Sequence, residues 1–136
     1  MGADQAENSF SVIEGGWNPC LLVICVAGLT TAEATACAAL SEDIGIELVR
    51  ESATPSLAKL CRRHGLTLAD VIVIASRPQD LPFILEAHMA FALQGSGYEN
   101  EAAADRVFPP RAAGGLVEAI RYVRALGALG APDTDR

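Results

Sequence analysis

Basic residues are scarce in this 136-residue chain, and lysine is almost absent. The sequence holds ten Lys and Arg residues, with Lys59 as the only lysine, against 17 Asp and Glu, and its formal net charge is −7 at pH 7. Affinity for a phosphate backbone or an anionic membrane surface depends on Lys and Arg that neutralise negative charge. We therefore expect neither nucleic acid nor a membrane as partner.

Long hydrophobic runs are missing as well. A membrane-spanning helix needs about 20 apolar residues, whereas the run 20–28 is much shorter and the stretch 81–93 is interrupted by Glu86 and His88. The first residues, MGADQAENS, carry acids where a signal peptide carries basic residues, and Ala6 stands where a myristoylation signal needs Ser or Thr. These features predict a cytoplasmic protein.

Cysteine pairs of the kind that bind zinc do not occur in the sequence. The four cysteines show no C-x-x-C spacing and no regular spacing with either histidine. Because zinc ligands usually come in close pairs, we expect no cysteine metal site. Cys25, in a predicted strand, and Cys37, on an alanine-rich helix, are interpreted instead as small buried apolar residues; the other two cysteines are Cys20 and Cys61.

Short apolar runs alternate with helix signals from residue 20 onward. Continuous apolar runs rich in β-branched residues are typical of strands that are covered on both faces. Thr30 and Glu33 have capping-box spacing, and Thr54 and Asp80 are candidate N-caps of two further helices. The predicted strands are 20–26, 46–49, 71–75 and 89–93, with a short edge strand at 106–108, and the last helix has Leu116, Ala119, Ile120 and Val123 inward.

This alternation predicts a three-layer α/β/α sandwich around a mostly parallel sheet, of the Rossmann-like type. We expect a single domain over residues 10–128, a flexible segment over 1–9 and a flexible tail over 129–136. The weak alternation of Phe10 to Ile13 fits only an antiparallel or peripheral arm, because too few residues separate it from the next strand for a parallel crossover.

The stretch from Val71 to Leu93 is where function is expected to concentrate. Its first apolar run stops at the polar turn Ser76-Arg77-Pro78-Gln79-Asp80. In α/β domains, ligands and catalytic groups collect in the loops at the carboxyl ends of the strands.

The order of residues from Leu66 to Val123 resembles the carboxyl half of the haloacid dehalogenase-like (HAD) phosphatases. That pattern runs from Gly-Leu through a strand, a G-D-x-x-x-D loop and Leu-Pro to "A-A-D-x-V" and a Gly-Gly turn into the final helix. The most similar branch is the capless one that includes the 3-deoxy-octulosonate 8-phosphate phosphatases. The matching residues here are Gly65-Leu66, Val71 to Ile74, Ala75 to Asp80, Leu81-Pro82, Ala103 to Val107, and Gly114 to Ile120.

Carried over residue by residue, the resemblance implies a truncated domain with degenerate catalytic motifs. The family uses a nucleophile and an acid/base in D-x-D at the end of the first strand, and no D-x-D precedes any core strand here. The nucleophile strand is therefore expected to be absent. The phosphate-holding Thr or Ser falls on Ala27, the lysine falls at or beside Ala53, and the first Asp of the magnesium loop falls on Ser76. Only the second Asp remains, as Asp80.

The resemblance leaves Asp80 and Ser76 as vestigial catalytic candidates and Asp80 as the one ligand for any Mg²⁺. Candidates for binding a phosphorylated ligand are Gly28, Thr30, Ser76 and Arg77. One carboxylate cannot serve both as nucleophile and as metal ligand. We expect no cofactor, and Mg²⁺ only if the protein is a phosphatase.

Three functions stay open from the sequence. The favoured hypothesis is a non-catalytic HAD-like domain that forms homo-oligomers or binds a partner enzyme, with sugar-nucleotide or sugar-phosphate metabolism as the implied setting. The first alternative is a magnesium-dependent phosphatase whose site is rearranged around Glu14, Ser76 and Asp80 or completed by a partner chain. The second is a module that binds a sugar phosphate or nucleotide without turnover. Without the central nucleophile strand, its two neighbours in the sheet are expected either to pair directly or to stay partly open.

Overall fold

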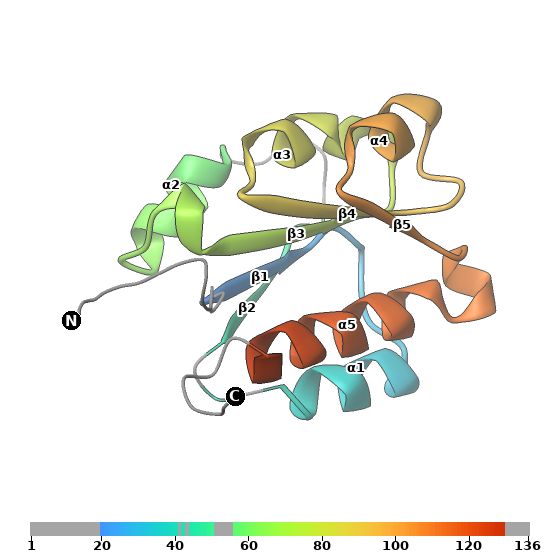
Figure 1. The fold of residues 1–136 in the computed structure, drawn as a ribbon, viewed down its shortest axis with the longest axis horizontal. Coiled ribbons are helices and arrows are strands. Elements are labelled where there is room, and N and C mark those ends of the chain that lie inside the picture. The colour runs from blue at the N-terminus through green and yellow to red at the C-terminus, as the bar shows by residue number, and fades with distance from the viewer. Residues whose placement is uncertain (1–19, 41, 43, 51–55, 130–136) are drawn as a thin grey trace.

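The computed structural model describes residues 20–40, 42, 44–50 and 56–129. These residues form a five-stranded sheet with helices on both faces (Figure 1). The strands are β1 (Leu21–Ile24), β2 (Gly45–Leu48), β3 (Val71–Ala75), β4 (Met89–Leu93) and β5 (Arg106–Phe108). The helices are α1 (Thr31–Ala38), α2 (Leu57–Arg63), α3 (Leu81–Glu86), α4 (Tyr98–Ala103) and α5 (Gly115–Leu129), with 3-10 turns η1 (Leu68–Asp70), η2 (Pro78–Asp80) and η3 (Arg111–Ala113).

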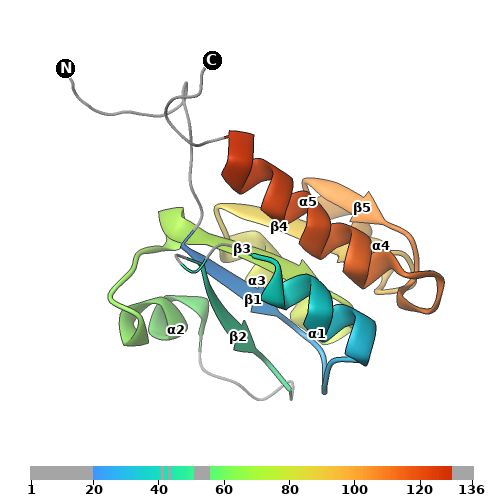
Figure 2. The same cartoon turned by 90° about the horizontal axis from the view of Figure 1, so that it is seen from below.

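The helices form two layers that sandwich the sheet. Helices α1 and α5 cover one face, and α2, α3 and α4 cover the other (Figures 1 and 2). Alternate residues of each strand enter the two cores, as the pleat requires: Leu22 and Ile24 of β1 pack toward α1 and α5, whereas Leu21 and Val23 pack toward α2. The predicted three-layer α/β/α sandwich is therefore confirmed.

Strand β1 closes the sheet by pairing directly with β3. The spatial order is β2-β1-β3-β4-β5, and every described pairing is parallel. Leu21 to Ile24 pair with Val71 to Ile74 on one side and with Gly45 to Leu48 on the other. No gap is left inside the sheet, and β1 continues into Cys25-Val26-Ala27 rather than into a D-x-D sequence.

Two of the three predicted helix caps lie within the described residues, and both N-cap residues stand at the predicted positions. The Glu33 N–H donates to Thr30 Oγ1 at 3.2 Å, and the Thr30 N–H donates to Glu33 Oε1 at 2.9 Å, which completes the capping box. Asp80 is the N-cap residue of α3 as predicted, but its carboxylate bonds to residues that precede it and makes no cap hydrogen bond to α3. Thr54 lies outside the described residues, and Ser56 is the N-cap of α2.

The last helix packs as its apolar spacing predicts. Leu116, Ala119, Ile120 and Val123 of α5 are fully buried against the sheet. The arm predicted at residues 10–13 lies outside the described residues. Within those residues, no helix has the length and apolar character that crossing a membrane requires.

Candidate functional site

An open cleft of about 340 Å³ lies at the carboxyl edge of the sheet, where β1, β3 and β4 end. Parallel strands deliver the residues that follow them to the same edge, which explains why loops distant in sequence meet there. Among the described residues of the lining, the two charged ones are arginines and none is a carboxylate. The lining residues are Val26, Ala27, Ser76, Arg77, Leu93, Gln94, Gly95 and Arg111.

The loop after β3 folds around the carboxylate of Asp80. Asp80 Oδ2 accepts hydrogen bonds from the Ser76 N–H at 3.1 Å and from the Arg77 N–H at 2.9 Å. The Asp80 side chain is only 3% exposed. Its hydrogen bonds to these backbone amides shape the turn η2, and Asp80 is not one of the residues that line the cleft.

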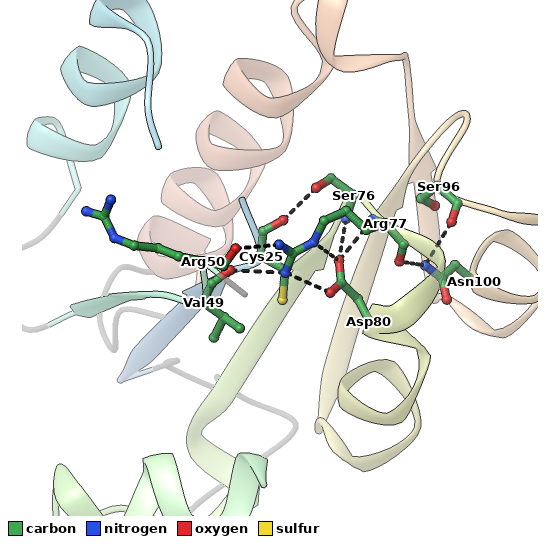
Figure 3. Close-up of polar contacts among 8 residues, drawn as sticks. All are labelled: Cys25, Val49, Arg50, Ser76, Arg77, Asp80, Ser96 and Asn100. Atoms are coloured by element: carbon green, nitrogen blue, oxygen red, sulfur yellow. Dashed lines mark hydrogen bonds and ion pairs between the residues drawn. The ribbon is translucent and has the colours of Figure 1, made fainter. Parts of the chain in front are cut away.

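Arg77 reaches from this loop across the end of β1 to the end of β2 (Figure 3). Its Nη1 donates to Arg50 O at 2.8 Å, and its Nη2 donates to Val49 O at 3.1 Å. On its other side, Nη2 lies 3.0 Å from Asp80 Oδ1 and Nε lies 3.4 Å from Asp80 Oδ2. A guanidinium, surrounded by two carbonyls and one carboxylate, is thus the resident cation at this edge of the sheet.

Cys25 stands beside this guanidinium at the end of β1, but its thiol is not suited to act as a nucleophile. Burial raises the pKa of the Cys25 thiol well above its usual range, the negative charge of Asp80 raises it further, and Arg77 offsets only part of the rise. The thiol is fully buried and neutral at physiological pH. The Cys25 carbonyl accepts from Ser76 Oγ at 2.5 Å, which ties the ends of β1 and β3 together.

The described residues at this edge do not fit a magnesium site. Mg²⁺ in phosphate-processing sites is usually held by one or two carboxylates together with phosphate oxygens, and Asp80 has both of its carboxylate oxygens engaged by Arg77 and backbone amides. Among the described residues, no cluster of three or more His, Cys, Asp or Glu could hold a metal ion.

The opposite wall of the cleft is held by an ion pair between Arg111 and Glu33. Arg111 Nη2 lies 2.6 Å from Glu33 Oε1, and Arg111 Nε donates to Glu33 Oε2 at 2.8 Å. The same Nη2 donates to Gly28 O at 2.5 Å. The hydrogen bond from Arg111 lowers the pKa of Glu33, with further lowering from Thr30, although burial opposes the shift.

The Glu33–Arg111 pair predicts an acid-dependent part of the stability. Because the folded-state pKa of Glu33 lies below its ordinary value of 4.5, this stabilisation is fully present above pH 4.5 and is lost as the pH falls through the folded-state value. Glu33→Gln is expected to lower the free energy of unfolding by about 2 kcal/mol at pH 7. On acidification, the free energy of unfolding of this variant is expected to fall less than that of the parent protein. Urea unfolding across a pH series measures both effects. Glu118→Gln, at an exposed position of α5, is the matched control, and an equal pH profile for both variants would contradict this assignment.

The structure brings some of the sequence-predicted ligand residues together and separates others. Ser76 and Arg77 line the cleft, and Gly28 is linked to it through Arg111. Thr30 uses its hydroxyl and its N–H in the capping box. A ligand-binding role for these residues stays a prediction.

Sequence reasoning missed Arg111, the second charged residue of the lining. No local motif connects Arg111 with Glu33, which lies 78 positions earlier in the chain. It also missed Asn100, whose Nδ2 donates to Arg77 O at 2.6 Å and to Ser96 O at 3.2 Å and so fixes the loop after β3 to α4 (Figure 3). Asp105, part of the "A-A-D-x-V" segment, accepts from the Ala90 N–H at 2.8 Å and joins β5 to β4.

Comparison with known proteins finds similarity in structure alone. No family model matches the chain, and no curated protein matches it. Among solved structures, the cobalt-bound deoxy-D-mannose-octulosonate 8-phosphate phosphatase of Haemophilus influenzae aligns at a TM-score of 0.64 and 15% identity, over 82% of this chain and 90% of that one.

Two further structures give the same result. The 3-deoxy-D-manno-octulosonate 8-phosphate phosphatase of Moraxella catarrhalis, solved with magnesium, phosphate and KDO, aligns at a TM-score of 0.65 and 13% identity, over 81% of this chain and 88% of that one. A protein of Streptomyces avermitilis described as a HAD family hydrolase aligns at a TM-score of 0.62 and 14% identity, over 86% of this chain and 91% of that one. At these identities the likeness establishes a HAD-like fold and leaves the activity open.

Proposed function

We propose that this protein is a non-catalytic HAD-like domain that works by self-association or by binding a partner enzyme in the cytoplasm. One observation carries the proposal: the guanidinium of Arg77 occupies the carboxyl edge of β1 and β2 and engages the carboxylate of Asp80 together with two main-chain carbonyls. An internal cation at that place competes with any metal for the same oxygens.

The chemistry of the site supports this proposal. Phosphoryl transfer through a covalent enzyme intermediate requires an activated nucleophile, and the end of β1 offers Cys25 with a raised thiol pKa, followed by Val26 and Ala27. The similar phosphatases of Haemophilus influenzae and Moraxella catarrhalis are named for a sugar 8-phosphate. We therefore favour a partner enzyme that acts in sugar-phosphate or sugar-nucleotide metabolism.

The metal and the activity are tested together. Millimolar Mg²⁺ is expected to leave the melting temperature unchanged, and a panel of phosphate monoesters is expected to show no Mg²⁺-dependent turnover, because the described residues include no cluster that could hold a metal ion. A related octulosonate phosphatase serves as positive control. Mg²⁺-dependent turnover that disappears in Asp80→Asn, with the fold checked by circular dichroism, would establish the phosphatase alternative.

A second candidate function is the binding of a phosphorylated small molecule without turnover. The observation that favours it is the cleft lining, where the described residues include Ser76, Arg77 and Arg111 but no acid. Sugar phosphates would then raise the melting temperature in the absence of metal, whereas the corresponding free sugars would not. If neither the sugar phosphates nor the free sugars change the melting temperature, this candidate is removed and the non-catalytic proposal remains.

A further inference from the structure

The layer of helices α2, α3 and α4 has an outer surface with an apolar centre. Leu85 on α3 is 67% exposed, and Tyr98 on α4 is 86% exposed. Pro82, three residues before Leu85, is exposed as well, so α3 turns an apolar stripe away from the sheet. Apolar patches that continue over neighbouring helices are typical of interaction surfaces.

Opposite charges flank this apolar centre on its two sides. Helix α3 lies between α2 and α4 and contacts both (Figure 1). The exposed residues of α2 include Lys59 and Arg62, together with Arg63, which pairs with Glu47. On the other side, Glu99 of α4 is exposed, and α3 itself adds the exposed acid Glu86 beside Leu85. The surface therefore runs from basic at α2, past Leu85 and Glu86 on α3, to acidic at α4.

We propose that this surface, which we call the α2-α3-α4 face, is the interface between two copies of this chain related by a two-fold axis through α3. A two-fold axis through the middle of a surface brings each end of it against the opposite end of the partner. Basic α2 of one copy then meets acidic α4 of the other, twice, and α3 packs on α3 with Leu85 at the centre.

Charge complementarity selects a second copy as the occupant. The chain as a whole carries a net charge of −7, so most pairings of two copies bring negative charge against negative charge. The α2-α3-α4 face contains both signs at opposite ends, and such a pattern is complementary to itself under a two-fold rotation. This inference rests on the proposed function, since it names the surface through which the domain self-associates.

Charge reversal at the two ends of the face gives the test. Arg62→Glu alone and Glu99→Arg alone are each expected to raise the dimer dissociation constant by at least about tenfold, because each places like charges together at both contacts of the dimer. An equimolar mixture of the two variants is expected to regain dimerisation, since the heterodimer has opposite charges at both contacts. Analytical ultracentrifugation over a concentration series measures these constants.

Matched variants separate this face from other surfaces. Arg121→Glu makes the same change of charge as Arg62→Glu at an exposed position of α5, on the other side of the sheet, and is expected to leave the dimer dissociation constant unchanged. Leu85→Ser is expected to weaken dimerisation without affecting the fold, because Leu85 is already exposed.

Any of three results overturns the inference. The parent protein could be monomeric at all concentrations, the charge-reversal variants could dimerise as tightly as Arg121→Glu, or the equimolar mixture of Arg62→Glu and Glu99→Arg could stay monomeric. A monomer without Mg²⁺-dependent turnover would remove this interface and keep the non-catalytic proposal. Mg²⁺-dependent turnover by a dimer that obeys the charge-reversal pattern would remove the non-catalytic proposal and keep the interface.

Discussion

Arg77→Ala is expected to lower the free energy of unfolding by about 3 kcal/mol, because removing one partner of a largely buried ion pair leaves the other charge uncompensated. The Arg77 side chain is 21% exposed and that of Asp80 only 3%. The carbonyls of Val49 and Arg50 lose their donors in the same step. Urea unfolding, followed by circular dichroism, measures the loss.

The controls for this prediction separate charge from geometry. Arg121→Ala removes an arginine at an exposed position of α5 and is expected to change stability by less than about 0.5 kcal/mol. Arg77→Lys keeps the charge but lacks the planar fork that serves Asp80 and the two carbonyls together, so it is expected to recover only part of the loss.

A double-mutant cycle shows whether Arg77 and Asp80 act as a unit. If they do, Arg77→Ala in the background of Asp80→Asn costs less than Arg77→Ala alone, by at least about 1 kcal/mol. Additive losses would show that the guanidinium stabilises the strand ends independently of the carboxylate. An Arg77→Ala variant as stable as the parent would contradict the role of Arg77 as resident cation.

The second large effect is expected at Gly115, the first residue of α5. A methyl group built at this position would overlap the carbonyl of Pro109 and lie 2.9 Å from Pro110 O. These are main-chain atoms, so the clash is not relieved by a change of rotamer. Gly115→Ala is expected to cost about 3 kcal/mol or more, at the upper end of what overpacking produces.

Two other glycines calibrate the Gly115 prediction. A methyl group at Gly28 would meet no atom within 4 Å, so Gly28→Ala is expected to be close to neutral. Gly114 has open space but a φ of +85°, and Gly114→Ala is expected to cost about 1 kcal/mol through backbone strain alone. Thermal unfolding of the three variants would contradict the packing argument if Gly115→Ala were no less stable than Gly114→Ala.

The alternation of strands and helices could be predicted because it depends on local patterns. Runs of apolar residues at β3 and β4 match the predicted strands 71–75 and 89–93 residue for residue. Strand β2 begins and ends one residue earlier than predicted, and β1 is shorter at both ends. Strand ends are set by which backbone groups find a partner across the sheet, and that depends on the neighbouring strands.

The sequence by itself determined the α/β layering, the capping box at Thr30 and Glu33, the inward face of α5 and the absence of D-x-D before any core strand, since periodicity, cap spacing and residue identity are all local properties. Only the tertiary structure decided that β1 pairs directly with β3 and that Arg77 spans from Asp80 to the end of β2. The carbonyls that Arg77 binds lie 27 and 28 positions away in the chain, and Glu33 lies 78 positions from Arg111. Such contacts exist only because parallel strands place their carboxyl ends at one edge of the sheet.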